Sequence, residues 1–109
     1  MAIGRNEELG VTVNVDPDTI RRKGNQVKLW ALLDFKSLQT VAGYSYLSSM
    51  QQREFDCAEE RHRTLALTEF SGNMGSGKPI DSFSVATKWE PVSPGSINQG
   101  LWKFVCVKQ

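Results

Sequence analysis

The chain contains two cysteines, Cys57 and Cys106, and this pair constrains the fold more than any other feature. An even number of cysteines in a short chain fits one structural disulfide, and such bonds persist outside the reducing cytosol. The bond would tie the C-terminus to the middle of the fold, and closing a loop of roughly 50 residues would stabilise it by about 4 kcal/mol. The alternative is two free, buried thiols in a cytosolic domain, because cysteine is often buried as a small apolar residue.

The length of 109 residues predicts one domain. We expect residues 1–8 to be a frayed start and residues 9–109 to form that domain. The formal net charge of +1 argues against nucleic acid as a partner, because nucleic acid favours strongly basic surfaces. No apolar run reaches the roughly 20 residues that a membrane span needs. We find no secretory signal in residues 1–8, so a disulfide would require that Met1 was added to a mature, exported domain.

Apolar side chains alternate with polar ones in several segments, which predicts strands. Val11, Val13 and Val15 begin the first strand, and the period of two returns in residues 26–35 and 80–89. Residues 43–55 and 64–70 also read as extended segments. Between the strands, Asp16 is expected to cap a single helical turn, and residues 23–25 to form a tight turn.

The end of the chain changes to a helical pattern. Ser93 is expected to be the N-cap and Pro94 the first helical residue. The residues that then recur at helical spacing are Ile97, Leu101, Phe104 and Val105. We therefore predict an α+β fold, an antiparallel sheet of five to six strands with one C-terminal helix packed on it.

Residues 72–78 match the spacing of a phosphate-binding loop, G-x-x-x-x-G-K. Pro79, however, stands where that motif needs a Ser or Thr hydroxyl for magnesium. A strand pattern follows in place of the helix that would hold the phosphate. We therefore expect a glycine-rich hairpin connection and no nucleotide partner.

The densest charge cluster, residues 58–63, contains the single histidine, His62. Glu59 or Glu60 would be the partner of a histidine general base, but no nucleophile accompanies them. Metal binding by Cys57 and His62 would need two further ligands, and none has a suitable spacing. We expect a solvated turn with weak ion pairs, and thus no enzyme, no catalytic residue, no metal and no cofactor.

Two groups of side chains are candidates for contact with a partner: the basic run Arg21, Arg22 and Lys23, and the aromatic pair Tyr44 and Tyr46. A short basic run usually marks a solvated turn, and a patch for an anionic partner is the alternative. Exposed aromatic residues often anchor protein partners. The three tryptophans are expected to serve mainly in the core.

Arg61 and Arg63 point the same way in a strand, so we expect both to face a carboxylate such as Asp56 or Glu69. On this hypothesis Arg61 supports the fold near Cys57 and does not contact a ligand.

Over residues 9–107 the chain resembles the surface-adhesin protein E family of Gram-negative bacteria. The most specific motifs are Asp56-Cys57-x-x-x-Arg61-x-Arg63 and Trp89-x-Pro91-Val92-x-Pro94-Gly95-Ser96. The resemblance implies a disulfide between Cys57 and Cys106. It also implies a small domain that is exported to the periplasm, outer membrane or cell surface, with an antiparallel sheet and a C-terminal helix.

The namesake of the family is an adhesin that binds host extracellular-matrix proteins, whereas many relatives have no assigned role. The shared residues look structural and do not define a binding site. We therefore expect an exported protein-binding module of the cell envelope, with a host-matrix or envelope protein as its partner. A periplasmic accessory or structural domain, which includes a homodimer, and a small-ligand carrier remain as alternatives.

Overall fold

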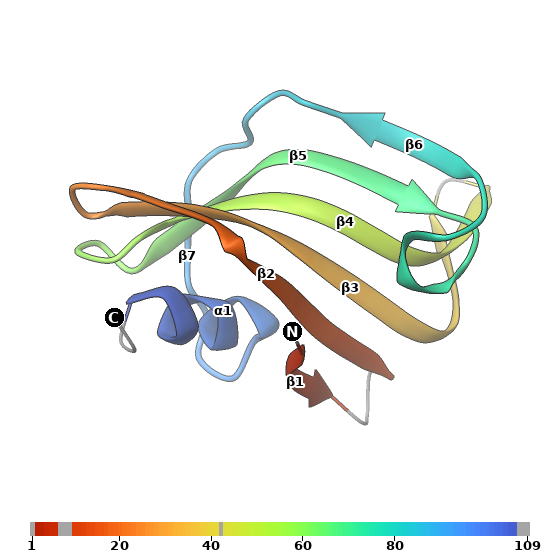
Figure 1. The fold of residues 1–109 in the computed structure, drawn as a ribbon, viewed down its shortest axis with the longest axis horizontal. Coiled ribbons are helices and arrows are strands. Elements are labelled where there is room, and N and C mark those ends of the chain that lie inside the picture. Colours follow the sequence, from red (N-terminus) through yellow and green to blue (C-terminus); the bar gives the residue numbers. More distant parts are fainter. Residues whose placement is uncertain (1, 7–9, 42, 107–109) are drawn as a thin grey trace.

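The computed structural model describes residues 2–6, 10–41 and 43–106. In these residues one antiparallel sheet is followed by one α-helix, α1, at Ile97–Cys106 (Figure 1). The strands are β1 (Ala2–Asn6), β2 (Val11–Lys23), β3 (Gln26–Val41), β4 (Tyr44–Asp56), β5 (Arg61–Phe70), β6 (Pro79–Phe83) and β7 (Glu90–Pro91). A short 3-10 helix, η1, spans Asn73–Gly75. The α+β prediction is confirmed, and the described residues form seven strands where five to six were expected.

The first six strands lie side by side in chain order, and β7 pairs with β5. Each pair of neighbouring strands is antiparallel, so short hairpins make most of the connections. In the β2–β3 hairpin Lys23 pairs with Gln26, and Gly24 adopts a φ of 61°. Such a glycine-first turn matches the right-handed twist of the flanking strands. The tight turn predicted at residues 23–25 is thus confirmed.

The core lies between α1 and one side of the sheet, which we call the helix face. Leu101 and Val105 of the helix are buried against apolar side chains that alternate along three strands: Val13, Val15, Val27, Leu29, Ala31 and Phe55. Successive side chains of a strand point to opposite faces, so these residues share one side. We call the other side the outer face.

Helix α1 lies across one end of the sheet (Figure 1), and the helix face continues beyond it. Ala31 pairs with Gln51, Gln51 with Leu67, and Leu67 with Phe83. Cross-strand partners lie on the same face, so this row runs from the core under α1 out to the sheet edge. Leu67 is half-buried and Phe83 is 39% exposed. The part of the helix face over β5 and β6 is therefore open.

The N-terminal residues differ from the prediction. Ala2–Asn6 form β1 and pair with β2, so the expected frayed start is wrong for these five residues. Residues 1, 7 and 8 lie outside the described residues. Ile3 packs against the buried core, which explains why this segment joins the sheet: it buries apolar surface there.

The helical turn expected after Asp16 is also wrong, because residues 16–20 remain within β2. The pairing of β2 with β3 is irregular at this point. The Thr19 hydroxyl donates to the Asp16 carbonyl oxygen at 2.7 Å and accepts the Trp30 N–H at 3.0 Å. This side chain therefore replaces a ladder bond at the irregularity, next to Pro17, which has no N–H to donate.

The strand expected over residues 80–89 ends early. Strand β6 stops at Phe83, and pairing resumes only in the two residues of β7. Between them Thr87 exchanges two hydrogen bonds with Thr64 of β5, one through its backbone N–H and one through its hydroxyl. The alternating pattern of this segment was therefore misleading beyond Phe83, because its backbone follows β5 without forming a regular ladder.

The helix begins later than predicted. The Ser96 hydroxyl accepts the N–H of Gln99 at 3.1 Å, and the Gln99 side chain accepts the N–H of Gly95 at 2.8 Å. Ser96 is thus the N-cap, in an arrangement close to a capping box, and the expectation for Ser93 is wrong. Gly95 has a φ of 77°, so Pro94 lies in a turn that precedes the helix.

Candidate functional site

Cys57 and Cys106 form a disulfide, with a Cα–Cα distance of 5.5 Å. Cys57 follows the last residue of β4, and Cys106 is the last residue of α1. Two hydrogen bonds reinforce this junction: the Trp102 indole donates to the Asp56 carbonyl oxygen at 3.2 Å, and Arg22 donates to the Val105 carbonyl oxygen at 2.7 Å. The helix is therefore fixed to the sheet at its C-terminal end, and the free-thiol alternative is wrong.

The predicted basic group lies at the β2–β3 hairpin, where all three side chains are exposed. Arg21 donates to the carbonyl oxygens of Asp18 and Ile20 at 2.8 and 2.9 Å. Arg22 binds the end of α1, as described above, where a cation favourably meets the helix dipole. Arg21 and Arg22 thus have structural partners within the chain.

The predicted aromatic group lies at the opposite end of β4. The Tyr44 hydroxyl donates to Glu69 at 2.7 Å and to Asp81 at 3.2 Å. The hydrogen bond to Glu69 and the burial and negative charge around it raise the pKa of Tyr44 above its ordinary value. Tyr46 packs edge-on against Phe35, with ring centroids 5.8 Å apart. Both tyrosines are half-buried and so retain accessible surface.

The sheet register keeps the two predicted groups apart. Asp56, at one end of β4, pairs with Gln26 beside the basic hairpin, whereas Tyr44, at the other end, pairs with Val41. Arg21, Arg22 and Lys23 therefore do not form one site with Tyr44 and Tyr46.

A polar ladder, formed by Ser49, Gln51 and Arg53, lies between these ends on the helix face of β4. Gln51 donates to the Ser49 hydroxyl at 3.1 Å, and Arg53 donates to the Gln51 side-chain oxygen at 3.1 Å. Ser49 is 3% exposed and Arg53 8%. The sequence analysis missed this ladder, although its spacing of two residues, continued by apolar Phe55, was the available signal.

Arg53 connects three elements. Its guanidinium donates to His62 Nδ1 of β5 at 2.6 Å and to the Asn98 side-chain oxygen of α1 at 2.8 Å. Burial lowers the pKa of Arg53 to about 10, so the group stays protonated at neutral pH. Burial and the charge of Arg53 lower the pKa of His62. His62 is therefore held as a neutral acceptor, which leaves it a structural partner of Arg53.

On the outer face, Arg61 and Arg63 stack on Trp89. Their guanidinium carbons lie 4.6 and 4.4 Å from the Trp89 ring centroid. Arg61 pairs with Asp56 at 3.1 Å, and Arg63 pairs with Glu54 at 2.7 Å. The expected carboxylate contacts are confirmed for Asp56. Glu69 is not a partner of either arginine, because the register places it on the helix face with Ser49 and Asp81.

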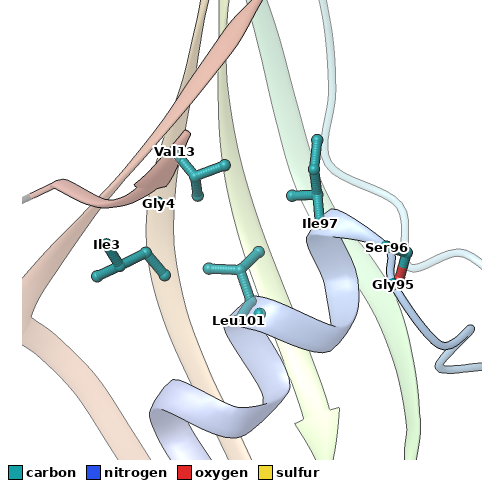
Figure 2. Close-up of a pocket in the computed structure, with 8 residues that line it drawn as sticks. Ile3, Gly4, Val13, Gly95, Ser96, Ile97 and Leu101 are labelled. Carbon is teal, nitrogen blue, oxygen red and sulfur yellow. The ribbon is translucent and has the colours of Figure 1, made fainter. Parts of the chain in front are cut away.

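Two apolar hollows flank the sheet. One, of about 200 Å³, lies between β1 and the start of α1, where Ile3 and Val13 face Ile97 and Leu101 (Figure 2). The other, of about 390 Å³, is lined by Asn14, Asp16, Thr19, Trp30, Leu32 and Met50. Trp30 is half-buried and Met50 is 37% exposed. The second hollow is thus a shallow apolar depression beside a tryptophan.

The glycine-rich segment at residues 72–78 connects β5 to β6, as predicted. Its polar groups already bind an anion of this chain: the Asp34 carboxylate accepts the N–H of Met74 at 2.7 Å and the Asn73 amide at 3.0 Å. The Ser48 hydroxyl accepts the N–H of Gly75 at 2.9 Å. These bonds fasten the connection to β3 and β4, which gives the glycines a structural role.

Within the part of the chain that the structure describes, no three His, Cys, Asp or Glu side chains gather where they could hold a metal ion. None of the described helices is long and apolar enough to cross a membrane.

Fold and site together define a small disulfide-linked sheet-and-helix domain with an open helix face. The chain belongs to the surface-adhesin protein E family, whose model matches residues 1–107. No curated protein sequence matches it. Its fold is similar to that of Haemophilus influenzae protein E in two structures, with TM-scores of 0.71 and 0.68 at 13% and 12% identity. These alignments cover 98% of this chain in both cases, and 87% and 84% of the other chains.

A structure of protein E from non-typeable Haemophilus influenzae gives a TM-score of 0.67 at 12% identity. That alignment covers 97% of this chain and 75% of the other. The similarity at such low identity shows the shared fold.

Proposed function

We propose that the protein is a non-catalytic binding module of the bacterial cell envelope that adheres to host extracellular-matrix proteins. The observation that carries the proposal is the open part of the helix face, which we define by Phe35, Tyr44, Tyr46, Leu67 and Phe83. The pairing of β3 with β4 is irregular next to Tyr46, and both tyrosines contact residues of the helix face, Tyr44 through Glu69 and Tyr46 through Phe35. These side chains are half-buried or exposed and lie outside the core under α1. Aromatic side chains of this kind are enriched at protein–protein interfaces.

Contacts within the chain would hold the two tyrosines in place for a partner. Tyr44 is fixed by Glu69 and Asp81, and Tyr46 by contact with Phe35. Aromatic residues that are already ordered lose little side-chain entropy on binding. Tyr44 and Tyr46 are therefore the predicted contact residues that we assign to this surface. The other predicted group, Arg21, Arg22 and Lys23, would form a separate basic surface at the β2–β3 hairpin.

Export is part of this proposal. A structural disulfide is typical of proteins that fold in an oxidising compartment, and membership of the surface-adhesin family agrees with a place in the envelope. The periplasm, the outer membrane and the cell surface are all locations that agree with this proposal.

Biolayer interferometry against immobilised matrix proteins tests the proposal. We expect micromolar binding by the wild type, weakened at least about fivefold by Tyr46→Ala and by Phe83→Ser, in the range of single interface contacts. Val85→Ser is the matched control, because Val85 is 75% exposed and lies beyond the end of β6. Lack of binding by the wild type, or an equal loss in the Val85 variant, would contradict the proposal.

The hollow beside Trp30 favours a second candidate, a carrier of small apolar ligands. Its volume of about 390 Å³ lies in the usual range of ligand sites. A dye that fluoresces on apolar surfaces, such as 1-anilinonaphthalene-8-sulfonate, should bind the wild type and bind the Met50→Glu variant more weakly, because the substitution introduces a negative charge into the hollow. Equal dye fluorescence in both proteins would remove this candidate.

A further inference from the structure

A third, polar cavity of about 200 Å³ lies between β4, β5 and residues 87–90. Its lining includes Arg53, His62, Thr64, Thr87, Lys88 and Glu90. Neither the disulfide junction nor the open helix face uses this cavity.

The cavity borders a buried cation, Arg53, that makes no direct ion pair with a described carboxylate. Arg53 is 8% exposed, and its acceptors Gln51, His62 and Asn98 are all neutral. Its Nε–H is buried and has no acceptor among the described residues. A buried charge that no opposite charge contacts is costly, and each unsatisfied donor adds to that cost.

The other side chains around the cavity supply further donors. His62 Nδ1 accepts an N–H from Arg53, which has no lone pair to offer. The proton of the neutral imidazole therefore lies on Nε2, where it is available to donate. Thr64 contributes a hydroxyl group and Lys88 an exposed ammonium group.

The charge balance of the lining is positive. Arg63 also lines the cavity, but its guanidinium is paired with Glu54 at 2.7 Å. Glu90 is the one carboxylate of the lining. Burial lowers the pKa of Arg53 more than the charge of Glu90 raises it, and Glu90 forms no ion pair with Arg53 or Lys88 among the described residues. Two cations without ion pairs, Arg53 and Lys88, thus face a single carboxylate.

We infer that this cavity binds a small tetrahedral oxyanion, sulfate or phosphate. Such an ion accepts hydrogen bonds from guanidinium, ammonium, imidazole N–H and hydroxyl groups, all of which line the cavity. It also brings negative charge into hydrogen-bond contact with Arg53, which the more distant charge of Glu90 does not do. The cavity volume suits a small ion, and the inference is independent of any protein partner.

His62 makes the test direct, because it is the single histidine of the sequence. Its imidazole resonances would be followed by NMR while sodium sulfate, and separately sodium phosphate, is titrated against sodium chloride at matched ionic strength. We expect a saturable shift with sulfate and phosphate at millimolar concentrations. A shift that does not saturate, or that chloride reproduces, would overturn the inference.

Two substitutions that change the charge of the cavity in opposite directions separate an effect on binding from a change in the fold. Lys88→Gln should weaken sulfate binding about threefold or more, and Glu90→Gln should tighten it by a similar factor, as expected for partly exposed charges. Lys103→Gln, on exposed helix surface away from the cavity, should leave the affinity unchanged. Equal sulfate affinities in all four proteins would overturn the inference.

Discussion

The guanidinium carbon of Arg63 lies 4.4 Å from the centroid of the Trp89 ring, and this contact holds the irregular segment after β6 against the outer face. Arg61 makes a second contact with the same ring at 4.6 Å. Trp89 precedes the two residues of β7, so the indole and the two arginines together anchor a segment that has few backbone bonds.

Replacement of Trp89 tests this anchor. Trp89→Ala should lower the free energy of unfolding by about 2–3 kcal/mol, because it removes two cation–π contacts and half-buried apolar surface. Trp89→Phe should lose about half as much, since a smaller ring remains under both guanidinium groups. Urea unfolding followed by circular dichroism measures both values. Equal losses in the two variants would show that stacking on the ring contributes nothing.

The disulfide should supply a large share of the stability. The Cys57→Ala/Cys106→Ala double variant should lose about 4 kcal/mol, because the bond closes a long loop in the unfolded chain. Residues 57 and 106 are 49 positions apart. A reducing agent should bring the wild type down to the stability of the variant and leave the variant unchanged. A double variant as stable as the oxidised wild type would refute this prediction.

The observed helix cap predicts a difference between two serines. Ser96→Ala removes the acceptor for the Gln99 N–H and should cost about 1 kcal/mol. Ser93 contributes only its backbone carbonyl oxygen to this turn, so Ser93→Ala should cost less than about 0.5 kcal/mol, as at other exposed sites. The reverse order in thermal unfolding would place the N-cap at Ser93.

Two glycines should respond in opposite directions to substitution by alanine. Gly100 lies within α1, and nothing stands within 4 Å of an added Cβ, so Gly100→Ala should stabilise the fold by about 0.5–1 kcal/mol. Gly77 has a φ of +77°, and its added Cβ would lie 2.9 Å from the Gly72 nitrogen. Gly77→Ala should therefore destabilise the fold, by about 1 kcal/mol or more. Denaturant midpoints of the two variants, each compared with that of the wild type, measure both changes in stability.

The His62–Arg53 contact predicts a pH dependence. Burial and the nearby Arg53 lower the pKa of His62 in the folded state, so below about pH 6.5 the unfolded chain binds this proton more readily than the folded one. The stability that neutral His62 contributes is complete above that pH and is lost as the pH falls through the folded-state pKa.

His62→Gln should lack this component. The free energy of unfolding, measured between pH 7.5 and 5, should fall more steeply for the wild type than for the variant. Parallel curves for the two proteins would mean that the His62 proton is not linked to folding.

Several features of the fold were predictable from local patterns. The alternation of Val11, Val13 and Val15, and of Val27, Leu29 and Ala31, correctly predicted strands with one buried side. The run of apolar residues after residue 96 predicted the helix. Errors lay at Asp16, Ser93 and residues 84–89, where hydrogen bonds to other strands or to a nearby side chain decided the backbone path. A further error lay at Ala2–Asn6, which pair with β2.

The candidate site was much less predictable. Tyr44 and Tyr46 were predicted as candidate contacts with a partner, but the position of Tyr44 beside Glu69 and Asp81 depends on the pairing of β4 with β5 and of β5 with β6. Arg53 was missed. Its spacing of two residues from Phe55 indicated the buried face, but an arginine at such a position is usually exposed, and only the tertiary contacts with His62 and Asn98 show that it is buried.

The sequence by itself determined the periodic elements, the pair of cysteines and the near-neutral charge, because these are properties of neighbouring residues or of composition. Tertiary structure alone decided that Arg53 is buried among neutral acceptors, that Trp89 meets two arginines, and that part of the helix face stays open. The physical reason is that burial and pairing depend on strand register and on where α1 ends, which bring together residues that are far apart along the chain.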